Sequence, residues 1–499
     1  MTYHSAVEAE LARRRRLWRP LLVLALIVVL AALVLGIAVL LRVLPSGTPH
    51  YRSDDAHFRH GSIGAEPESG IPYKVWMALP ELFPERFAPQ GDYSAFGFLY
   101  DGETLPVGLS RRTVSGVDLV WFNCAVCHTG TVRETAEAAP ELISGMPAQQ
   151  LDLHGFTRFI LDAATDPRVS PERLRAAMRH SGNALGPVEA LIWRIAVFPR
   201  LREGMIDRAA RLSPLLDRQP AWGPGRVDTF NPYKVLAFRQ HARELTEGEV
   251  VGASDFPSIF LQGPREGMQL HWDGNNTSLA ERNLSAALGA GVTPAAADHP
   301  AIERIARWLR DLPPPPSPHR PDPAAVDRGR AVYARDCAGC HGWQSDDGYV
   351  FEGDRLGTVE PFASVGTDRA RLDSYTQSFR DAQVRELFRG TPYAFRNFTK
   401  TDGYANAPLD GLWLRGPYLH NGSVPTLADL LAPPEARPPR FRRGSDVIDP
   451  QGGFVSPPCD GGPGCFDTTL RGNSNAGHLW GTGLPAPEKS DLLAYLLTF

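Results

Sequence analysis

Apolar residues recur three or four positions apart in several segments of the chain, which is the spacing of one face of an α-helix. Three such segments are Pro300–Leu312, Ala324–Cys337 and Glu488–Phe499. Sustained alternation of apolar and polar residues is rare. It is clearest in Arg112–Phe122, where it predicts a short strand or hairpin. The pattern predicts a mainly α fold, and 47 glycines with 45 prolines predict long loops between the helices.

An apolar run, Leu21–Leu41, has 21 residues without a charge, enough to span a bilayer as one helix. Arg13–Arg16 and Arg19 precede it, and positively charged residues tend to stay on the cytoplasmic side. The following "LLRVLPSG" offers no small-x-small cleavage site, which favours an uncleaved anchor over a cleaved signal peptide or a buried core helix. We therefore expect one transmembrane helix in the inner membrane, with the rest of the chain in the periplasm.

The charge balance narrows the possible partners. A formal net charge of -4 over 499 residues provides no basic excess for binding phosphate backbones, so nucleic acid is not an expected partner. A hydrophobic fraction of 43% is typical of a globular protein, and the length predicts at least two domains. The Pro-rich tract at 312–323 is typical of a stiff linker between them.

Four of the six cysteines lie in a repeated C-x-x-C-H motif. Composition alone predicts about 0.002 matches to this motif in the whole chain, so two matches are a strong signal. The motif residues are Cys124, Cys127 and His128 in the first copy, and Cys337, Cys340 and His341 in the second.

The spacing suits covalent attachment of haem. Two thiols add to the haem vinyl groups, and the next histidine becomes the proximal ligand of the iron. A thioredoxin-like site would not need the histidine, and a zinc site would need both motifs to converge in space, so these alternatives are less favoured. We expect two haem c groups, with His128 and His341 as proximal ligands.

The remaining cysteines, Cys459 and Cys465, share a Gly- and Pro-rich loop without a histidine. In an oxidising compartment such a pair is expected to form a disulfide.

The sixth ligand of the second haem must come from a small set of residues. No methionine follows the second motif, because the last one is Met268. Only two histidines follow it, His420 in "GPYLHNGSVPTL" and His478 in "GNSNAGHLWGTGL". One of the two is the expected ligand.

The chain resembles the bacterial di-haem cytochrome c peroxidase superfamily. Within that superfamily, the rubber-oxygenase-like branch is the most similar to the chain. The resemblance runs from Ser115 to the C-terminus. It rests on the two haem motifs, "HWDGNNTSLAERN" at His271–Asn283, "LRGPYLHNGSVPTLADLL" at Leu414–Leu431, and the closing "GHLWGTGLPAPEKSDLLAYLLTF".

The apolar run, the Pro-rich tract and the resemblance together predict a domain organisation. The expected parts are residues 1–45, a basic cytoplasmic stretch and anchor; 46–114, an N-terminal extension; 115–311, a first cytochrome c-like haem domain; 312–323, the linker; and 324–499, a second cytochrome c-like haem domain.

The resemblance also implies roles for individual residues. Trp272, in the W-D-G motif, would lie between the haems and carry electrons, whereas a packed core tryptophan is the alternative. His478 occupies the place of the distal ligand of the second haem. His420 would then be a hydrogen-bonded histidine near the haem edge.

The distal side of the first haem has no clear candidate. His154, His180, His241 and His271 all follow the first motif, and none has diagnostic spacing. The peroxidases carry an acid-base glutamate on the loop after W-D-G, but 282–297 contains no carboxylate. Glu281 precedes that segment, and a helix-start or surface carboxylate is an equally good interpretation of it. Small apolar residues there would leave a pocket for O2 or an apolar substrate.

Two classes of function follow. In the first, a bis-histidine second haem passes electrons through Trp272 to an open first haem that activates peroxide or O2. In the second, the protein is only an electron-transfer cytochrome. Either function requires a redox partner protein or the quinone pool as a source of electrons.

Overall fold

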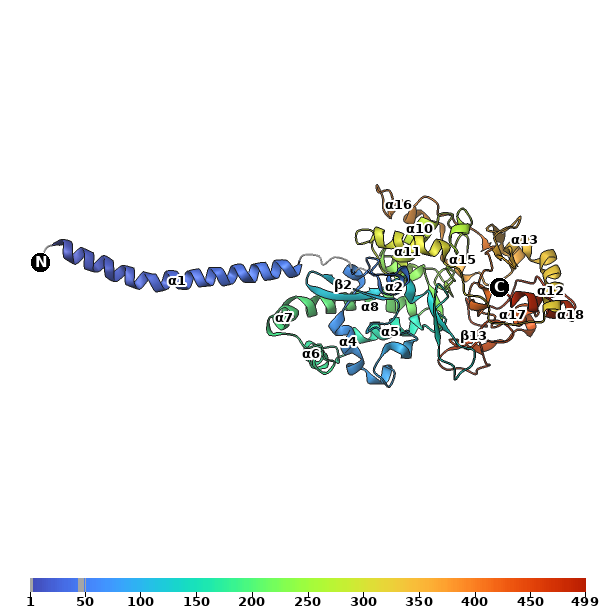
Figure 1. Ribbon diagram of the computed structural model, residues 1–499, viewed down its shortest axis with the longest axis horizontal. Coiled ribbons are helices and arrows are strands. Elements are labelled where there is room, and N and C mark those ends of the chain that lie inside the picture. The colour runs from blue at the N-terminus through green and yellow to red at the C-terminus, as the bar shows by residue number, and fades with distance from the viewer. Residues whose placement is uncertain (1–2, 44–48, 50) are drawn as a thin grey trace.

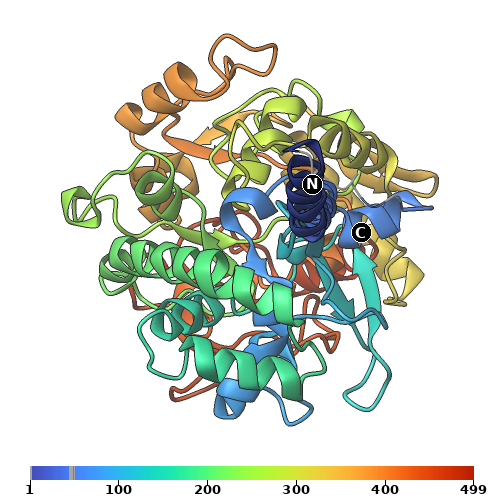
Figure 2. The same ribbon diagram turned by 90° about the vertical axis from the view of Figure 1, so that its left-hand side faces the viewer.

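A computed structural model describes the backbone of residues 3–43, 49 and 51–499. One long helix, α1 (Tyr3–Val43), extends away from the body of the protein. In the body, the earlier segments lie nearer α1 and the C-terminal segments lie at the opposite end (Figure 1). Figure 2 looks along α1 and shows the remaining elements gathered behind it.

The expectation of a transmembrane helix at 21–41 is wrong for this structure. Within the described part of the chain, no helix is long and apolar enough to cross a membrane. The inner-membrane, single-pass localisation that we inferred from this segment is corrected with it.

The fold class that we predicted also has to be corrected. Besides lacking a described membrane helix, the chain forms six small antiparallel sheets within its described residues. The largest has the order β1-β3-β2 and contains β1 (Ile71–Pro72), β2 (Leu109–Val114) and β3 (Val117–Phe122). The β2–β3 hairpin confirms the strand signal of Arg112–Phe122.

The other sheets are hairpin-sized pairs that tie loops together. Their strands are β4 (Thr129–Val132) with β5 (Glu141–Ser144), β6 (Arg226–Asp228) with β7 (Ala253–Asp255), β8 (Trp343–Ser345) with β9 (Gly348–Val350), β10 (Val359–Pro361) with β11 (Gly403–Ala405), and β12 (Arg440–Arg442) with β13 (Cys465–Asp467).

Helices supply most of the regular structure before the linker. They are α2 (Asp54–His60), α3 (Glu66–Ser69), α4 (Tyr73–Leu82), α5 (Leu153–Ala163), α6 (Pro171–His180), α7 (Pro187–Ile192), α8 (Phe198–Leu216), α9 (Asn231–Leu236), α10 (Leu279–Gly289) and α11 (His299–Asp311). A π-helical turn, Trp193–Val197, joins α7 to α8.

After the linker the helices are shorter, apart from the first and last. They are α12 (Pro323–Asp336), α13 (Ala338–His341), α14 (Phe362–Val365), α15 (Ala370–Ser374), α16 (Gln377–Glu386), α17 (Leu427–Leu430) and α18 (Ala486–Leu496). The three predicted helices are confirmed as α11, α12 and α18, with starts and ends shifted by a few residues.

One hydrophobic core crosses the Pro-rich linker. Phe379, Phe395 and Phe398 follow the linker in sequence, but they pack in the same buried cluster as Leu284 and Ile302, which precede it. The segment around α16 is therefore part of the core formed by α10 and α11. A second core joins the predicted N-terminal extension to the predicted first haem domain, because Trp76, Tyr93 and Phe98 pack with residues of α5.

The helices α12 and α18 cross closely at Gly329. A Cβ atom at this position would lie 1.9 Å from the backbone oxygen of Asp491 and 3.0 Å from Cβ of Tyr495. Only glycine allows this approach. The crossing places the C-terminal end of α12, and with it Cys337, against the core of the second half.

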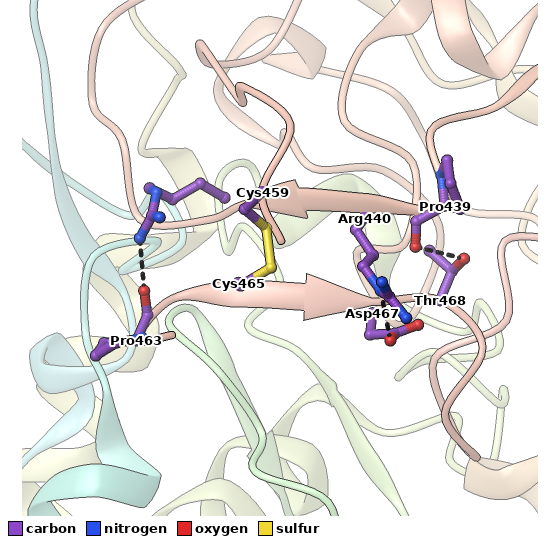
Figure 3. The surroundings of a disulfide bond; sticks show 8 residues. Pro439, Arg440, Cys459, Pro463, Cys465, Asp467 and Thr468 are labelled. Atoms are coloured by element: carbon purple, nitrogen blue, oxygen red, sulfur yellow. Dashed lines mark hydrogen bonds and ion pairs between the residues drawn. A yellow bond between two sulfur atoms is a disulfide. The ribbon is translucent and has the colours of Figure 1, made fainter. Parts of the chain in front are cut away.

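The predicted Cys459–Cys465 disulfide is confirmed, and it joins the loop before β13 to the start of that strand (Figure 3). In the β12–β13 pair, Arg440 lies opposite Asp467 and donates to its carboxylate over 2.8 Å. Phe466 of β13 is buried beneath the guanidinium groups of Arg226 and Arg443, whose central carbons lie 4.8 and 5.3 Å from its ring centre.

Replacing Gly329 by alanine should destabilise the protein, because the new methyl group meets backbone rather than a movable side chain. We expect a loss of about 1–3 kcal/mol in the free energy of unfolding, the usual cost of overpacking. Urea denaturation followed by circular dichroism measures it. Gly204→Ala in the exposed part of α8, where a Cβ meets nothing within 4 Å, is the control and should leave stability equal or slightly higher. Equal stability of Gly329→Ala and the wild type would contradict the close crossing.

Candidate functional site

The first C-x-x-C-H motif forms a tight turn directly after β3. Residues Cys124–Val126 make one 3-10 turn. The side chain of Asn123 caps it, because its Oδ1 accepts from the Ala125 amide over 2.9 Å. The Nδ2 of Asn123 donates to the Gly61 carbonyl over 3.0 Å, which ties the turn to the loop after α2.

The ring of His128 is held by a backbone carbonyl. Its Nδ1 donates to the carbonyl oxygen of Pro257 over 2.9 Å. Since Nδ1 carries the hydrogen, Nε2 holds the lone pair that a metal would need. Desolvation, with a smaller effect of the nearby Arg282, lowers the pKa of His128 to about 4, so the ring is neutral at physiological pH.

The second motif follows α12 and has the same arrangement. Cys337 ends that helix and α13 carries Cys340 and His341. Nδ1 of His341 donates to the carbonyl oxygen of Ala407 over 2.8 Å, and desolvation lowers the pKa of the ring. The Tyr349 hydroxyl donates to the carbonyl of His341 and accepts from the Leu409 amide, which fixes the turn.

His478 faces His341 across a space that suits a metal between two imidazoles. The two ring centres are 6.4 Å apart, with an angle of 38° between the rings. Two metal–nitrogen bonds of about 2 Å, plus the distance from each nitrogen to its ring centre, give a separation of about 6 Å. Nδ1 of His478 is buried and has no hydrogen-bond partner within the described residues. Its left-handed backbone, with φ of 49°, is uncommon outside glycine.

His420 is fully occupied by other contacts. Its Nε2 lies 3.0 Å from the Tyr404 hydroxyl, and the two rings stack with centres 4.2 Å apart. Its backbone carbonyl accepts from the Asp255 amide over 2.9 Å. The residue is buried, and desolvation holds its pKa well below the usual value. Of the two late histidines, the structure brings only His478 to His341.

The electrostatics of the motif cysteines disfavour a thioredoxin-like site. None of the four forms a disulfide. Desolvation raises the pKa of Cys124 to about 11 and those of Cys127 and Cys337 to about 12, whereas a redox-active thiol needs a lowered pKa. In the described part of the chain, no group of three or more His, Cys, Asp or Glu side chains could hold a metal ion.

Trp272 is hydrogen-bonded to the two backbone segments that hold the motif histidines. Its Nε1 donates to the carbonyl of Asp255 over 2.9 Å, two residues before the Pro257 carbonyl that holds His128. Its own carbonyl accepts from the Ala405 amide over 2.9 Å, two residues before the Ala407 carbonyl that holds His341. Trp272 therefore sits between two short backbone segments, each of which accepts a hydrogen bond from one motif histidine.

The four histidines considered for the first site have different surroundings. His154 is buried on α5 against the ring of Trp222, and His180 and His241 are exposed. His271 is the one that shares a neighbour with the first motif. Arg282 acts electrostatically on Cys124, His128 and His271.

Half of the segment expected to be a loop after W-D-G, 282–297, is helical. Its first part belongs to α10, capped by the Ser278 side chain. The Glu281 carboxylate accepts from the backbone amides of Arg396 and Asn397 and from Nδ2 of Asn397 over 2.7 Å. This agrees with the structural interpretation of Glu281, a helix-start carboxylate that anchors a loop.

Residues 403–442 match a family model described as RoxA-like, cytochrome c-like. The chain carries a RoxA-like cytochrome c-like region. The region includes β11, Ala407 and His420, and it supports a relationship to RoxA-like di-haem cytochromes c. A cytochrome c-like region implies covalently bound haem c, and the free motif thiols, neutral histidines and orphaned His478 nitrogen fit that group. The wider resemblance to di-haem peroxidases stays a prediction.

Two curated relatives come from Sinorhizobium fredii (strain NBRC 101917 / NGR234). The uncharacterized protein y4iM is 32% identical over 211 residues, which cover 39% of this chain and 48% of the relative. The uncharacterized protein y4iJ is 27% identical over 549 aligned positions, which cover 90% of this chain and 85% of the relative. The chain thus matches about half the length of the first relative and most of the second.

Three important groups were missed in the sequence. The carbonyls of Pro257 and Ala407 carry no side-chain signal, because every residue has a carbonyl. Arg282 follows the "WDG" motif in sequence, within the same matched segment, but nothing in its spacing indicates that its charge acts on Cys124.

The motif geometry predicts two covalent haems, one on each pair of free cysteines. Mass spectrometry of the denatured chain, expressed with a c-type maturation system, should find the mass of two haem groups. Cys337→Ala/Cys340→Ala should retain one, and Cys459→Ala/Cys465→Ala, the control pair, should retain two. Fewer than two haems on the wild-type chain would contradict the assignment.

Proposed function

We propose that the protein is a di-haem oxidoreductase in which the second haem site stores and passes electrons and the first activates peroxide or O2. The observation that carries this proposal is the position of Trp272 between the two motifs. On one side its indole donates to the Asp255 carbonyl, two residues before the Pro257 carbonyl that holds His128. On the other side its carbonyl accepts from the Ala405 amide, two residues before the Ala407 carbonyl that holds His341.

The second site is assigned as closed. His341 and His478 would hold its haem from opposite sides, as the 6.4 Å separation of their rings supports. A haem with two histidine ligands supplies one-electron transfer and leaves no position for a substrate. The protein's part is to keep both imidazoles neutral and fixed, which the Ala407 carbonyl and the desolvation of both rings support.

The first site is assigned as open. Within the described residues no histidine ring makes with His128 the ring contact that His478 makes with His341. An iron held there by His128 alone would keep a position for an oxidant. Electrons would come from a one-electron donor, either a protein or a quinol, and reach the first site through Trp272.

Replacing His478 by glycine should change the second haem from low-spin to high-spin, because its iron loses one of two strong ligands. His478→Met should stay low-spin with a raised reduction potential, since methionine ligation stabilises the ferrous state. Absorption and electron paramagnetic resonance spectra measure both. His241→Gly, an exposed histidine, is the matched control and should leave the spectra unchanged. An unchanged spectrum for His478→Gly would remove this ligand assignment.

Replacing Trp272 by phenylalanine should slow electron exchange between the haems without loss of either, because the indole N–H donor to Asp255 disappears. Stopped-flow reduction followed at both haem bands measures the rate. Trp121→Phe is the control, since its indole also donates to a backbone carbonyl, that of Ala290, over 2.9 Å. Wild-type exchange rates in Trp272→Phe, or wild-type protein that binds neither cyanide nor CO, would favour a different path or a simple electron carrier.

A further inference from the structure

His271 is fixed in one orientation, and its ring neighbour Phe398 belongs to the buried cluster against which Cys124 of the first motif packs. Its Nδ1 lies 2.6 Å from Oδ1 of Asn275, and because that oxygen can only accept, Nδ1 carries the hydrogen. In the neutral ring, Nε2 then holds a lone pair. Within the described residues Nε2 has no partner. A ring locked at one nitrogen and free at the other is arranged to exchange a proton at the free one.

The surroundings of His271 are rigid. Its ring lies nearly parallel to the buried ring of Phe398, with centres 6.4 Å apart. The carbonyl of Asn275 accepts from the Thr399 amide over 2.8 Å, and Leu270 donates to the Asn276 carbonyl over 2.7 Å. These bonds hold the backbone of His271 in a left-handed conformation with φ of 64°, which costs free energy and is typical of functional positions.

Arg282 acts electrostatically on both His271 and the first motif, and within the described residues it has no counter-ion. Within the described residues its guanidinium has no hydrogen-bond or ion-pair partner. Desolvation, followed by repulsion from Arg265, lowers its pKa to about 10. An unpaired charge that is half-buried is costly. It becomes useful where negative charge develops during a reaction.

Nearby carboxylates are already committed. Glu281 anchors the loop at Arg396 and Asn397. Asp273 is buried and accepts from Arg371 over 2.9 Å. Of the side chains of His271, Asp273 and Glu281, that of His271 has a nitrogen without a partner, at which it can exchange a proton.

We propose that His271, oriented by Asn275 and supported by the charge of Arg282, is the proton-transfer residue for hydrogen peroxide at the first haem site. This inference rests on the proposed function, and it commits the oxidant to peroxide. It also accounts for the missing carboxylate of 282–297, because an imidazole takes its place from the other side of W-D-G.

The proton balance of the step is simple. Nε2 of His271 takes the proton from the peroxide oxygen nearer the iron and returns it to the outer oxygen. The O–O bond then breaks, and the outer oxygen leaves as water while Arg282 stabilises the negative charge that develops on it. The other oxygen takes up two protons from solvent and two electrons from the one-electron donor, and it leaves as a second water.

Several charges act on the His271 ring. Its pKa is lowered to about 4, because desolvation and the charges of Arg282 and Arg371 together outweigh Asp273 and the bond to Asn275, which raise it. Asn275→Asp would strengthen the last effect without removing a hydrogen bond, because Nδ2 of Asn275 has no partner within the described residues. This variant should therefore move the pH midpoint of the peroxide reaction upward.

Two reactions test the proposal on the purified protein with both haems. Peroxide consumption and the association of cyanide both require a proton to leave the incoming molecule, since hydrogen cyanide binds as its anion. His271→Leu should slow both by about 10²–10⁴-fold, the usual range for loss of a general acid-base group. Arg282→Leu should slow peroxide consumption, and His241→Leu, an exposed histidine, should change neither rate.

Each outcome separates the inference from the proposed function. Wild-type protein that binds no cyanide removes the proposed function and the inference together. Cyanide binding that is equally fast in wild type and His271→Leu, or a pH midpoint unmoved in Asn275→Asp, overturns the inference alone. A change of the first haem from low-spin to high-spin in His271→Leu would make this residue an iron ligand, which also overturns its role in proton transfer.

Discussion

The hydrogen bond from Nδ1 of each motif histidine to a backbone carbonyl is the constraint on which the rest of the site depends. It fixes the tautomer, leaves the lone pair of Nε2 for a metal and ties each motif to a distant segment of the chain. The segments at Pro257 and Ala407 lead within two residues to the partners of Trp272. The positions of the two motifs and of the tryptophan between them therefore depend on one another.

The same constraint explains why buried charges gather around these segments. Asp255 is held by Arg443, and Arg443 and Arg226 enclose the ring of Phe466 on the disulfide-linked hairpin. Burial raises the pKa of Asp255 to about 6 and lowers that of Arg226 to about 9. The disulfide-linked hairpin is therefore connected through Arg443 to Asp255, whose carbonyl accepts from the Trp272 indole N–H.

Local patterns in the sequence predicted local structure well. The C-x-x-C-H spacing, the hairpin before the first motif and the three amphipathic helices depend on neighbouring residues, and they are found within a few positions of their expected limits. Long-range pairings were harder to predict. Counting ligands left His420 and His478, and the family resemblance favoured His478, but the unpaired charge of Arg282 and the carbonyl partners depend on contacts between segments far apart. The apolar run at 21–41 misled us, because composition alone does not establish a spanning helix.

The core shared across the Pro-rich linker limits how such a protein can evolve. A tract like 312–323 invites the view that each half is a cassette that recombination could exchange. Phe379, Phe395 and Phe398 nevertheless fill the core built by α10 and α11, so a foreign second half would leave a cavity in the first. The two halves are bound to change together, and substitutions in one should be matched by substitutions in the other.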